Sequence, residues 1–199
     1  MKRLKALVIF VILCVVPALS VWAHPHIFIT PKAVFQFEDS TLKGIREEWL
    51  FDEIYGSTLI MDYDRNRDKT FSANELKKIK AEAFDNLQYY NYFTFLYVNG
   101  VRKKELAISD FDVKIENGTV RYLFTINLDV RAGAKPQSVK LTMYDDTYFV
   151  AFDALHREDL SLSPESSPAS FELSKAKVTA LYPGQVMPDQ TVLTIEAKQ

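Results

Sequence analysis

Two Asn-Gly pairs, each flanked by runs in which apolar and polar residues alternate, constrain the fold of this chain more than any other feature. Asn99-Gly100 lies between the segments FTFLYV and VRKKELAI, and Asn117-Gly118 lies between FDVKIE and TVRYLFTINLDV. Alternation with a period of two predicts half-buried strands, and Asn-Gly supplies the left-handed backbone that a two-residue hairpin turn requires. The sequence therefore predicts antiparallel strand pairs that meet at these two turns.

The same alternation recurs along most of the chain. Ile27 to Glu38 and Thr41 to Phe51 are expected to form strands joined by a turn at Glu38-Asp39-Ser40. The segments SVKLTMY, TYFVAF, SFELS and TVLTIEA supply further strands, roughly eight to ten in all. The Ser- and Pro-rich segment from Leu160 to Ser170 is expected to be a surface loop. The fold class indicated is mainly β, an antiparallel β-sandwich or a barrel-like sheet.

One part of the chain has a different period. From Ala73 to Tyr90 the apolar residues recur at helical spacing, and a shorter helical segment is expected from Ile54 to Met61. The sequence thus predicts a helix-loop-helix inserted at about residues 54–90 of a single β-rich domain that spans residues 24–199.

The loop between these two helical segments, DRNRDKTFSANE, has the spacing of an EF-hand calcium loop. Ca²⁺ prefers about six to eight oxygen ligands, and short oxygen-bearing side chains at alternate positions of a tight loop point inward. We therefore expect a structural Ca²⁺ ion here. The residues at loop positions 1, 3, 5, 7, 9 and 12 are Asp64, Asn66, Asp68, Thr70, Ser72 and Glu75.

Position 6 of this loop departs from the usual pattern, because Lys69 stands where such loops have glycine. A left-handed backbone at a lysine costs roughly 1 kcal/mol, which weakens Ca²⁺ binding without excluding it. An alternative interpretation needs no ion: Ser72 is a helix N-cap, and Glu75 three residues later completes a capping box.

The first residues of the chain have the three parts of a secretory signal peptide. Lys2, Arg3 and Lys5 precede an apolar run, which a stretch of small residues ending at Ala23 follows. We expect residues 1–23 to be removed by cleavage after Ala23 and the mature protein to be periplasmic, with no spanning segment. The single cysteine, Cys14, leaves with the signal, so the domain is expected to fold without disulfides.

The charge of the chain argues against a nucleic-acid partner. The whole chain has a formal net charge of −2, and the signal removes basic residues but no acidic ones. A mildly acidic exported protein without a basic run lacks the positive surface that binds phosphate backbones.

Two of the three histidines lie beside the expected cleavage site, in SVWAHPHIF. Cleavage after Ala23 makes His24 the N-terminus, where its α-amine and its imidazole can both bind a metal near neutral pH. In an extended segment His26 points to the same face as His24. Pro25 has no amide hydrogen, which excludes the square-planar site that uses backbone amides.

The sequence therefore predicts a transition-metal site at the mature N-terminus, for Zn²⁺, Ni²⁺, Co²⁺ or Cu²⁺. Two other interpretations stay open: histidines without a function near a chain end, and a copper-binding enzyme in which His24 and a further histidine hold the metal. The candidate additional ligands are His156, Asp52 and Asp145.

Five segments in order resemble one protein family. They are AHPHIFI, EEWLFDEIY, the calcium-type loop, YYNYFTFLYVNG and MYDDTYFVAF, and together they span nearly the whole mature chain. This set is similar to the bacterial periplasmic family known as domain of unknown function 1007. The resemblance implies an accessory component of a nickel, cobalt or zinc transport system, with an inner-membrane metal permease as its partner. Family members typically have Asp-Gly where this chain has Asp68-Lys69.

A binding module without a transition metal is the main alternative to this accessory role. The segment YYNYFTF, from Tyr89 to Phe95, is dense in aromatic residues. A calcium-stabilised domain that exposes part of this segment would engage another protein through it.

Overall fold

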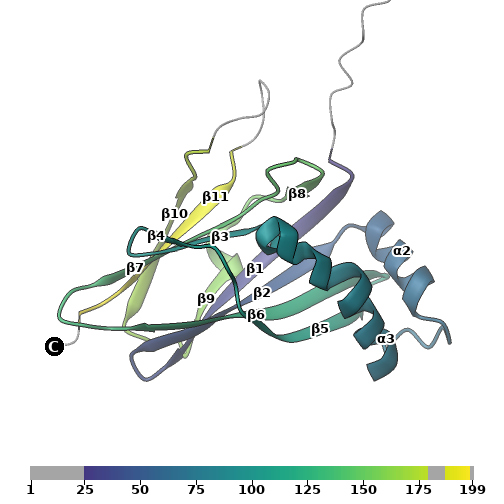
Figure 1. Cartoon of the computed structure of the whole chain (residues 1–199), viewed down its shortest axis with the longest axis horizontal. Coiled ribbons are helices and arrows are strands. Elements are labelled where there is room, and N and C mark those ends of the chain that lie inside the picture. The colour runs from purple at the N-terminus through teal and green to yellow at the C-terminus, as the bar shows by residue number, and fades with distance from the viewer. Residues whose placement is uncertain (1–24, 179–186, 198–199) are drawn as a thin grey trace, which may run out of the picture.

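The computed structural model of this chain describes residues 25–178 and 187–197. Its strands form two β-sheets arranged as a sandwich, and a helical insertion lies at one end of it (Figure 1). The predicted mainly-β, sandwich-like fold class is therefore confirmed. Within the described part of the chain, no helix is both long and apolar enough to cross a membrane.

The first sheet has the order β5-β6-β2-β1-β8, and β9 pairs with β1 further along the same edge. Its two longest pairings, β1 with β2 and β2 with β6, are antiparallel. The strands are β1 (Ile27–Glu38), β2 (Thr41–Phe51), β5 (Ile108–Glu116), β6 (Thr119–Arg131), β8 (Val150–Phe152) and β9 (Leu160–Ser163).

The second sheet has the order β10-β11-β7-β3-β4, with every pairing antiparallel. Rings of the two sheets meet in the core, where Phe35 of the first sheet lies 6.0 Å from Phe171 of the second. The strands are β3 (Thr94–Val98), β4 (Val101–Lys103), β7 (Gln137–Met143), β10 (Ala169–Lys175) and β11 (Asp189–Ile195).

Both predicted Asn-Gly hairpins are present. Asn99 and Gly100 have φ angles of 50° and 81° between β3 and β4, and Asn117 and Gly118 have 53° and 84° between β5 and β6. Two successive left-handed residues twist the chain so that the flanking strands pair. The expected strands from Ile27 to Glu38 and from Thr41 to Phe51 also match β1 and β2.

The expected surface loop from Leu160 to Ser170 is wrong in its first part, because β9 occupies Leu160–Ser163. This strand pairs in parallel with β1, as does β8. The segment Leu-Ser-Leu-Ser alternates with a period of two, and Leu160 is buried. Its serines obscured a strand pattern that becomes visible once a long-range partner is known.

The helical insertion contains several short helices instead of the two expected ones. The predicted helix from Ala73 to Tyr90 changes its period after Ile79. A π turn widens the helix there, and Ile79 and Phe84, five residues apart, are both fully buried. The elements are α2 (Glu53–Tyr63), α3 (Ala73–Ile79), the π-helix η1 (Lys80–Phe84) and the 3-10 helix η2 (Asp85–Phe93); a further 3-10 turn, η3 (Arg157–Asp159), precedes β9.

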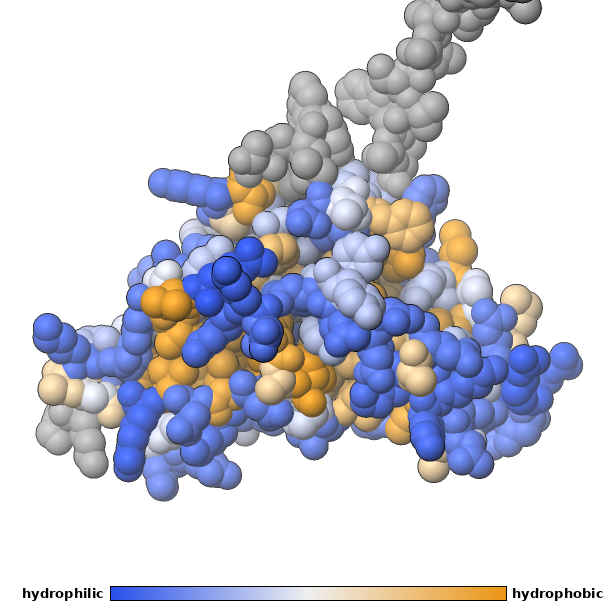
Figure 2. Space-filling model, viewed as in Figure 1, coloured by the Kyte–Doolittle hydropathy of each residue, from blue (hydrophilic) through white to orange (hydrophobic). Residues whose placement is uncertain are grey.

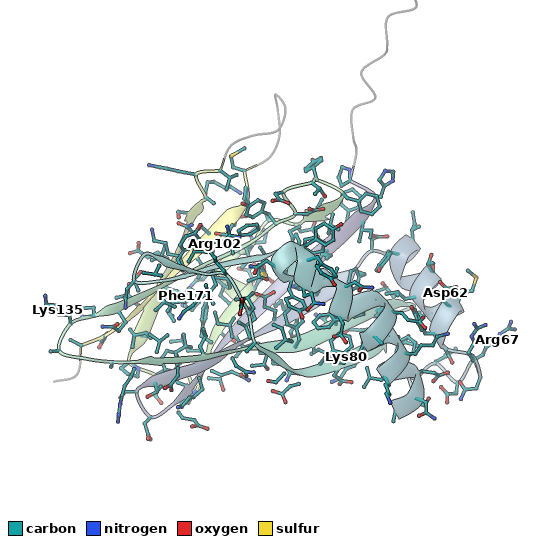
Figure 3. All side chains as sticks on the ribbon, in the orientation of Figure 1. Asp62, Arg67, Lys80, Arg102, Lys135 and Phe171 are labelled. Carbon is teal, nitrogen blue, oxygen red and sulfur yellow. The ribbon has the colours of Figure 1, made fainter. Side chains whose placement is uncertain are left out.

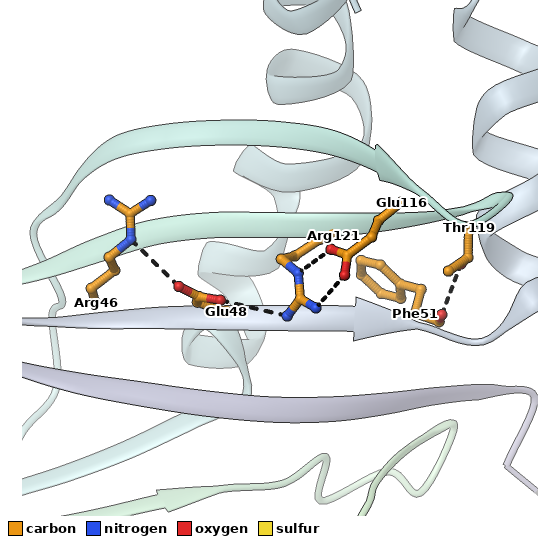
Figure 4. A network of polar contacts seen from close by, with 6 residues as sticks. All are labelled: Arg46, Glu48, Phe51, Glu116, Thr119 and Arg121. Carbon is orange, nitrogen blue, oxygen red and sulfur yellow. Dashed lines mark hydrogen bonds and ion pairs between the residues drawn. The ribbon is translucent and has the colours of Figure 1, made fainter. Parts of the chain in front are cut away.

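Helix α2 is fixed to the end of the first sheet by a close contact with β6. The Thr119 hydroxyl donates to the Phe51 carbonyl at 2.8 Å, as Figure 4 shows, and also lies 3.0 Å from the Asp52 carbonyl. A Cβ atom at Gly56 would lie 2.0 Å from the Thr119 hydroxyl oxygen. Only glycine permits this approach of the helix to the strand.

A charged network covers the outer side of β2, β5 and β6 beside this contact (Figure 4). Arg121 donates to both carboxylate oxygens of Glu116, at 2.7 and 3.1 Å, and its guanidinium lies 3.5 Å from Glu48. The guanidinium lowers the pKa of Glu116 through these hydrogen bonds. The network ties three neighbouring strands together through their side chains.

Candidate functional site

The loop from Asp64 to Glu75 closes around its first carboxylate. Asp64 ends helix α2 and is buried, and its two carboxylate oxygens accept the backbone N–H groups of Asp68 at 3.2 Å and Lys69 at 3.1 Å. The side chain at position 1 is thereby held on the inner side of the turn, where an EF-hand loop places its first ligand.

Lys69 adopts the left-handed conformation that this turn needs, with a φ angle of 64°. Arg67, two residues earlier, also has a positive φ of 60°, and in Figure 3 its side chain extends outward at the tip of the insertion. The turn at position 6 is therefore formed although the residue there is a lysine, and the lysine backbone is strained as a result.

The predicted capping box is present at the start of α3. The Ser72 hydroxyl accepts from the Glu75 N–H, while Glu75 Oε2 accepts from the Ser72 N–H at 2.9 Å. The other oxygen of Glu75 accepts the backbone N–H of Arg65 at 3.0 Å. Glu75 thus joins the two ends of the loop, and capping is one of its roles whether or not an ion binds.

The central carboxylate of the loop, Asp68, accepts hydrogen bonds from the Thr70 N–H and hydroxyl and from the Asn66 amide. These bonds, those of Thr70 first, lower the pKa of Asp68. The Ser72 backbone N–H and hydroxyl, with a smaller effect of the Arg65 N–H, lower the pKa of Glu75. Both side chains are therefore carboxylates at neutral pH, and the donor set is all oxygen, which suits a hard cation.

The predicted histidine site is only partly within the described residues, because His24 lies outside them. His26 is exposed just before β1, and its backbone N–H donates to the Phe149 carbonyl at 2.9 Å. Its ring centroid lies 5.0 Å from that of Phe149. The imidazole is therefore presented at the surface, next to the loop that leads into β8.

The other candidate ligands serve local structure. Asp52 caps α2 by accepting from the Ile54 and Tyr55 N–H groups, and it also accepts the Phe28 N–H at 2.8 Å. Asp145 is buried and accepts three backbone N–H groups, two from the turn before β8 and one from the first residue of β8.

His156 is exposed at the N-cap of η3. In the described part of the chain, no three His, Cys, Asp or Glu side chains are grouped so as to hold a metal ion. The transition-metal site with His24 stays a prediction.

An apolar cavity of about 480 Å³ lies between the first sheet, the helical insertion and the loop before β8. The sequence did not reveal it, because its walls come from segments far apart in the chain. Trp49, Phe51 and Phe93 form buried parts of the wall. At its rim the aromatic side chains of Tyr90 and Phe149 are 52% and 53% exposed.

A buried acid lies directly behind the indole of Trp49. The Glu47 side chain is fully buried, accepts the Trp49 Nε1–H at 3.0 Å and lies 3.1 Å from the Thr94 hydroxyl. Burial raises the pKa of Glu47 to about 8, so this side chain is largely a neutral acid at pH 7. The signal was present in the sequence, since Glu47 alternates with Ile45 and Trp49 on the apolar face of β2.

The fold defines a two-sheet β protein with a helical insertion between β2 and β3. The chain belongs to the family described as "Protein of unknown function (DUF1007)", which matches residues 9–190, so the family resemblance is confirmed. It is 32% identical over 139 residues to the "Uncharacterized 15.5 kDa protein in trpE 3'region" of Spirochaeta aurantia, which covers 68% of this chain and 97% of that protein. It is also 26% identical over 161 residues to an "Uncharacterized protein" of Haemophilus influenzae, covering 80% and 76% of the two chains.

Proposed function

We propose that this chain is an exported cation-binding protein whose loop from Asp64 to Glu75 holds one Ca²⁺ ion. One observation carries the proposal: the turn closes around Asp64. Both carboxylate oxygens of Asp64 accept backbone N–H groups of the turn, and Lys69 has a positive φ angle in it. A lysine in the left-handed conformation that glycine normally adopts is strained, and such strain persists where a site requires the geometry. This supports a binding role for the loop.

Each predicted ligand has a chemical role in this proposal. Asp64, Asn66 and Asp68 supply side-chain oxygens, Thr70 supplies its carbonyl, and Ser72 holds a water. Glu75 closes the site from the first turn of α3. The ion would stabilise the helical insertion and, with it, one wall of the cavity.

Calorimetric titration of the metal-stripped mature protein with Ca²⁺ tests this proposal. Replacing Glu75→Gln keeps an N3 side chain that can complete a capping box but removes the charge that a cation needs. We expect this variant to lose Ca²⁺ binding by at least about tenfold and to lose the Ca²⁺-induced rise in Tm.

The matched control is Asp62→Asn, which removes an exposed carboxylate of α2 near the loop but outside the ligand set (Figure 3). It is expected to bind Ca²⁺ like the parent protein. If Ca²⁺ leaves the Tm of the parent unchanged at millimolar concentration, the loop is a helix cap alone.

We propose, second, that cleavage after Ala23 exposes a transition-metal site formed by His24 and His26. The exposed ring of His26 and the anchoring of its backbone to Phe149 favour this, because the site would be accessible and attached to a fixed point of the fold. Together with the family resemblance, this supports a periplasmic accessory protein that binds Zn²⁺, Ni²⁺, Co²⁺ or Cu²⁺ and delivers it to an inner-membrane permease.

Two preparations test the second proposal: a mature chain beginning at His24 and one with a single extra residue before it. N-terminal sequencing of the secreted protein establishes the cleavage site first. Tight binding of one of these four metals that is lost on extension, and lost below about pH 6, supports the histidine site. If both preparations bind only Ca²⁺, the protein is a calcium-stabilised interaction module.

A further inference from the structure

The outer face of the second sheet carries aromatic and basic side chains side by side. Residues paired across strands share a face, and Tyr97 of β3 is paired with Arg102 of β4 and with Lys140 of β7. Leu96 and Leu141, next to Tyr97 and Lys140 in the sequence, are buried on the opposite face. The row from Arg102 to Lys140 therefore points away from the core.

A groove of about 290 Å³ lies on this face of the sheet. Its volume is close to the lower end of the range for small-molecule sites. Strand β3 contributes Phe95 and Tyr97 to its lining, β7 contributes Lys140 and Thr142, and β11 contributes Gln190. The lining thus combines aromatic rings with cations and with uncharged hydrogen-bonding groups. The remaining lining residues are Gly100, Tyr144, Ala176, Lys177 and Val178.

Arg102 is held beside the groove by stacked aromatic rings. The rings of Phe95 and Tyr144 are stacked with their centroids 4.2 Å apart, and the Arg102 guanidinium carbon lies 4.9 Å from the Phe95 centroid. A guanidinium group that lies over a ring keeps its N–H groups in its own plane, where two of them can still donate to one carboxylate. The guanidinium of Arg102 has no ion-pair partner among the described residues. It is therefore a positioned cation with free donors.

The groove is positive although the whole chain has a net charge of −2. Lys140 and Lys177 are exposed, line the groove and have no ion-pair partner in the described part of the chain, and no described lining residue is acidic. Burial and then the charge of Asp146 raise the pKa of Tyr144, so one acid acts on this end of the groove from outside its lining. Figure 2 shows hydrophilic side chains gathered over the β3–β4 hairpin, in the left half of the view. A positive groove on an acidic protein favours an anionic ligand.

We propose that this groove binds an acidic sugar, a hexuronate unit of a polysaccharide, with its carboxylate at Arg102 and Lys140. A pyranose ring has an apolar C–H face that packs on aromatic rings, and Tyr97 lines the groove without stacking on another described ring. The sugar hydroxyl groups find partners in the side chains of Thr142 and Gln190. This inference is independent of the proposed cation sites, because it rests on the second sheet alone.

A phosphate ligand suits this groove less well than a carboxylate. Phosphate sites commonly use free backbone N–H groups at a helix N-terminus or in a glycine-rich loop. Strands β3, β7 and β11 are each paired on both sides, so their N–H groups are used in the sheet. Side-chain donors are what the floor of the groove offers. Adenosine monophosphate therefore serves as the competing ligand in the test.

The first test is calorimetric titration of the mature protein with a galacturonate trimer and with a hyaluronan tetrasaccharide, which contains glucuronate. The methyl ester of the galacturonate trimer is the matched control, because it has the same rings without the charge. We expect saturable binding of an acidic oligosaccharide, weakened by added NaCl, and binding of the ester at least about tenfold weaker. The proposal is overturned if neither acid binds at about 10 mM, if the ester binds equally well, or if adenosine monophosphate binds more tightly.

The second test changes two adjacent residues of β4. Arg102→Gln removes the stacked cation, whereas Lys103→Gln removes a cation whose residue is paired with buried Leu96 and so belongs to the other face. Arg102→Gln is expected to weaken hexuronate binding about five- to tenfold, and Lys103→Gln to change it less than about twofold. Equal losses in the two variants would mean that the sugar responds only to overall charge and would overturn the assigned site.

The third test concerns the ring of Tyr97. Tyr97→Leu is expected to weaken the binding of the acidic oligosaccharide about fivefold, because the sugar loses the ring on which it packs. Tyr97→Phe keeps the ring and is expected to stay within about twofold of the parent protein. Thermal melts show whether both variants fold. Parent affinity in a folded Tyr97→Leu variant would exclude the sugar from this groove.

Discussion

Lys69 combines two features that oppose Ca²⁺ binding, a left-handed backbone and a positive charge. Replacing Lys69→Gly removes both, while Lys69→Ala removes only the charge and keeps a Cβ atom at a φ angle of 64°. Because this exposed loop can relax when it is empty, we expect the glycine variant to bind Ca²⁺ about fivefold more tightly than the alanine variant. Calorimetric titration measures this difference. Equal Ca²⁺ affinities of the two variants would show that backbone strain at position 69 does not weaken Ca²⁺ binding.

Residue identity predicted the capping box at Ser72 and Glu75, which is present, whereas the Ca²⁺ site of the same loop stays a prediction. The spacing from Asp64 to Glu75 and the capping box follow from local geometry, which a sequence shows directly. Asp52 and Asp145 looked like possible metal ligands, yet they accept backbone N–H groups near them in the fold. The apolar cavity was missed because its walls come from segments that are far apart in the sequence.

At the scale of single elements, hairpins were predictable and changes of helical period were not. The Asn-Gly turns specify their own backbone conformation, and β1 and β2 alternate clearly. The π turn at Lys80–Phe84 depends on what the insertion packs against, because it brings Phe84 into a stack with Phe111 at 4.0 Å. Strand β9 likewise depends on β1, which lies more than a hundred residues earlier.

The contact between α2 and β6 leads to a prediction about that element. Gly56→Ala would place a methyl group 2.0 Å from the Thr119 hydroxyl and 2.9 Å from its Cα atom. The helix must then move away from the strand, which we expect to lower the free energy of unfolding by about 1–3 kcal/mol. Urea denaturation measures this loss.

Gly133→Ala is the matched control for that variant. The nearest atom to a Cβ at Gly133 is the Gln137 side-chain nitrogen at 3.8 Å, an ordinary contact. The control is expected to change stability by less than about 0.5 kcal/mol. A loss in the Gly56 variant no larger than in this control would mean that α2 is held loosely.

Glu47 couples the stability of the whole molecule to pH, because it lies between the two sheets and meets Thr94 of the second one. The pKa of Glu47 is about 8 in the folded protein, compared with the ordinary value of 4.5 that applies in the unfolded chain. Because the folded protein favours the neutral acid, Glu47 stabilises the fold in full at pH values below its unfolded pKa. This stabilisation is lost as the pH rises through the folded pKa. Between pH 5 and pH 8 the parent protein is expected to lose roughly 4 kcal/mol of unfolding free energy from this group.

Glu47→Gln should remove this pH dependence, because the amide stays neutral and can still accept from the Trp49 indole. Urea titrations at pH 5 and pH 8 give the slope of the unfolding free energy against pH for the parent and for the variant. The difference between these two slopes isolates Glu47 from other titrating groups. Glu172→Gln, an exposed change on β10, is the control and is expected to keep the parent slope. A parent protein as dependent on pH as the Glu47 variant would contradict the burial of an uncharged acid.

The parallel pairing of β8 and β9 with β1 has a consequence for the order in which the chain acquires its structure. If the chain crosses a membrane from its N-terminus, β1 emerges early and finds β2 at once, but its other edge waits for residues 150–163. During that interval an apolar strand offers unpaired backbone groups to any neighbouring chain. A chain translocated in this way would depend on a holding chaperone or on rapid completion of transit, and a pause between β7 and β8 would be the point of greatest risk of aggregation.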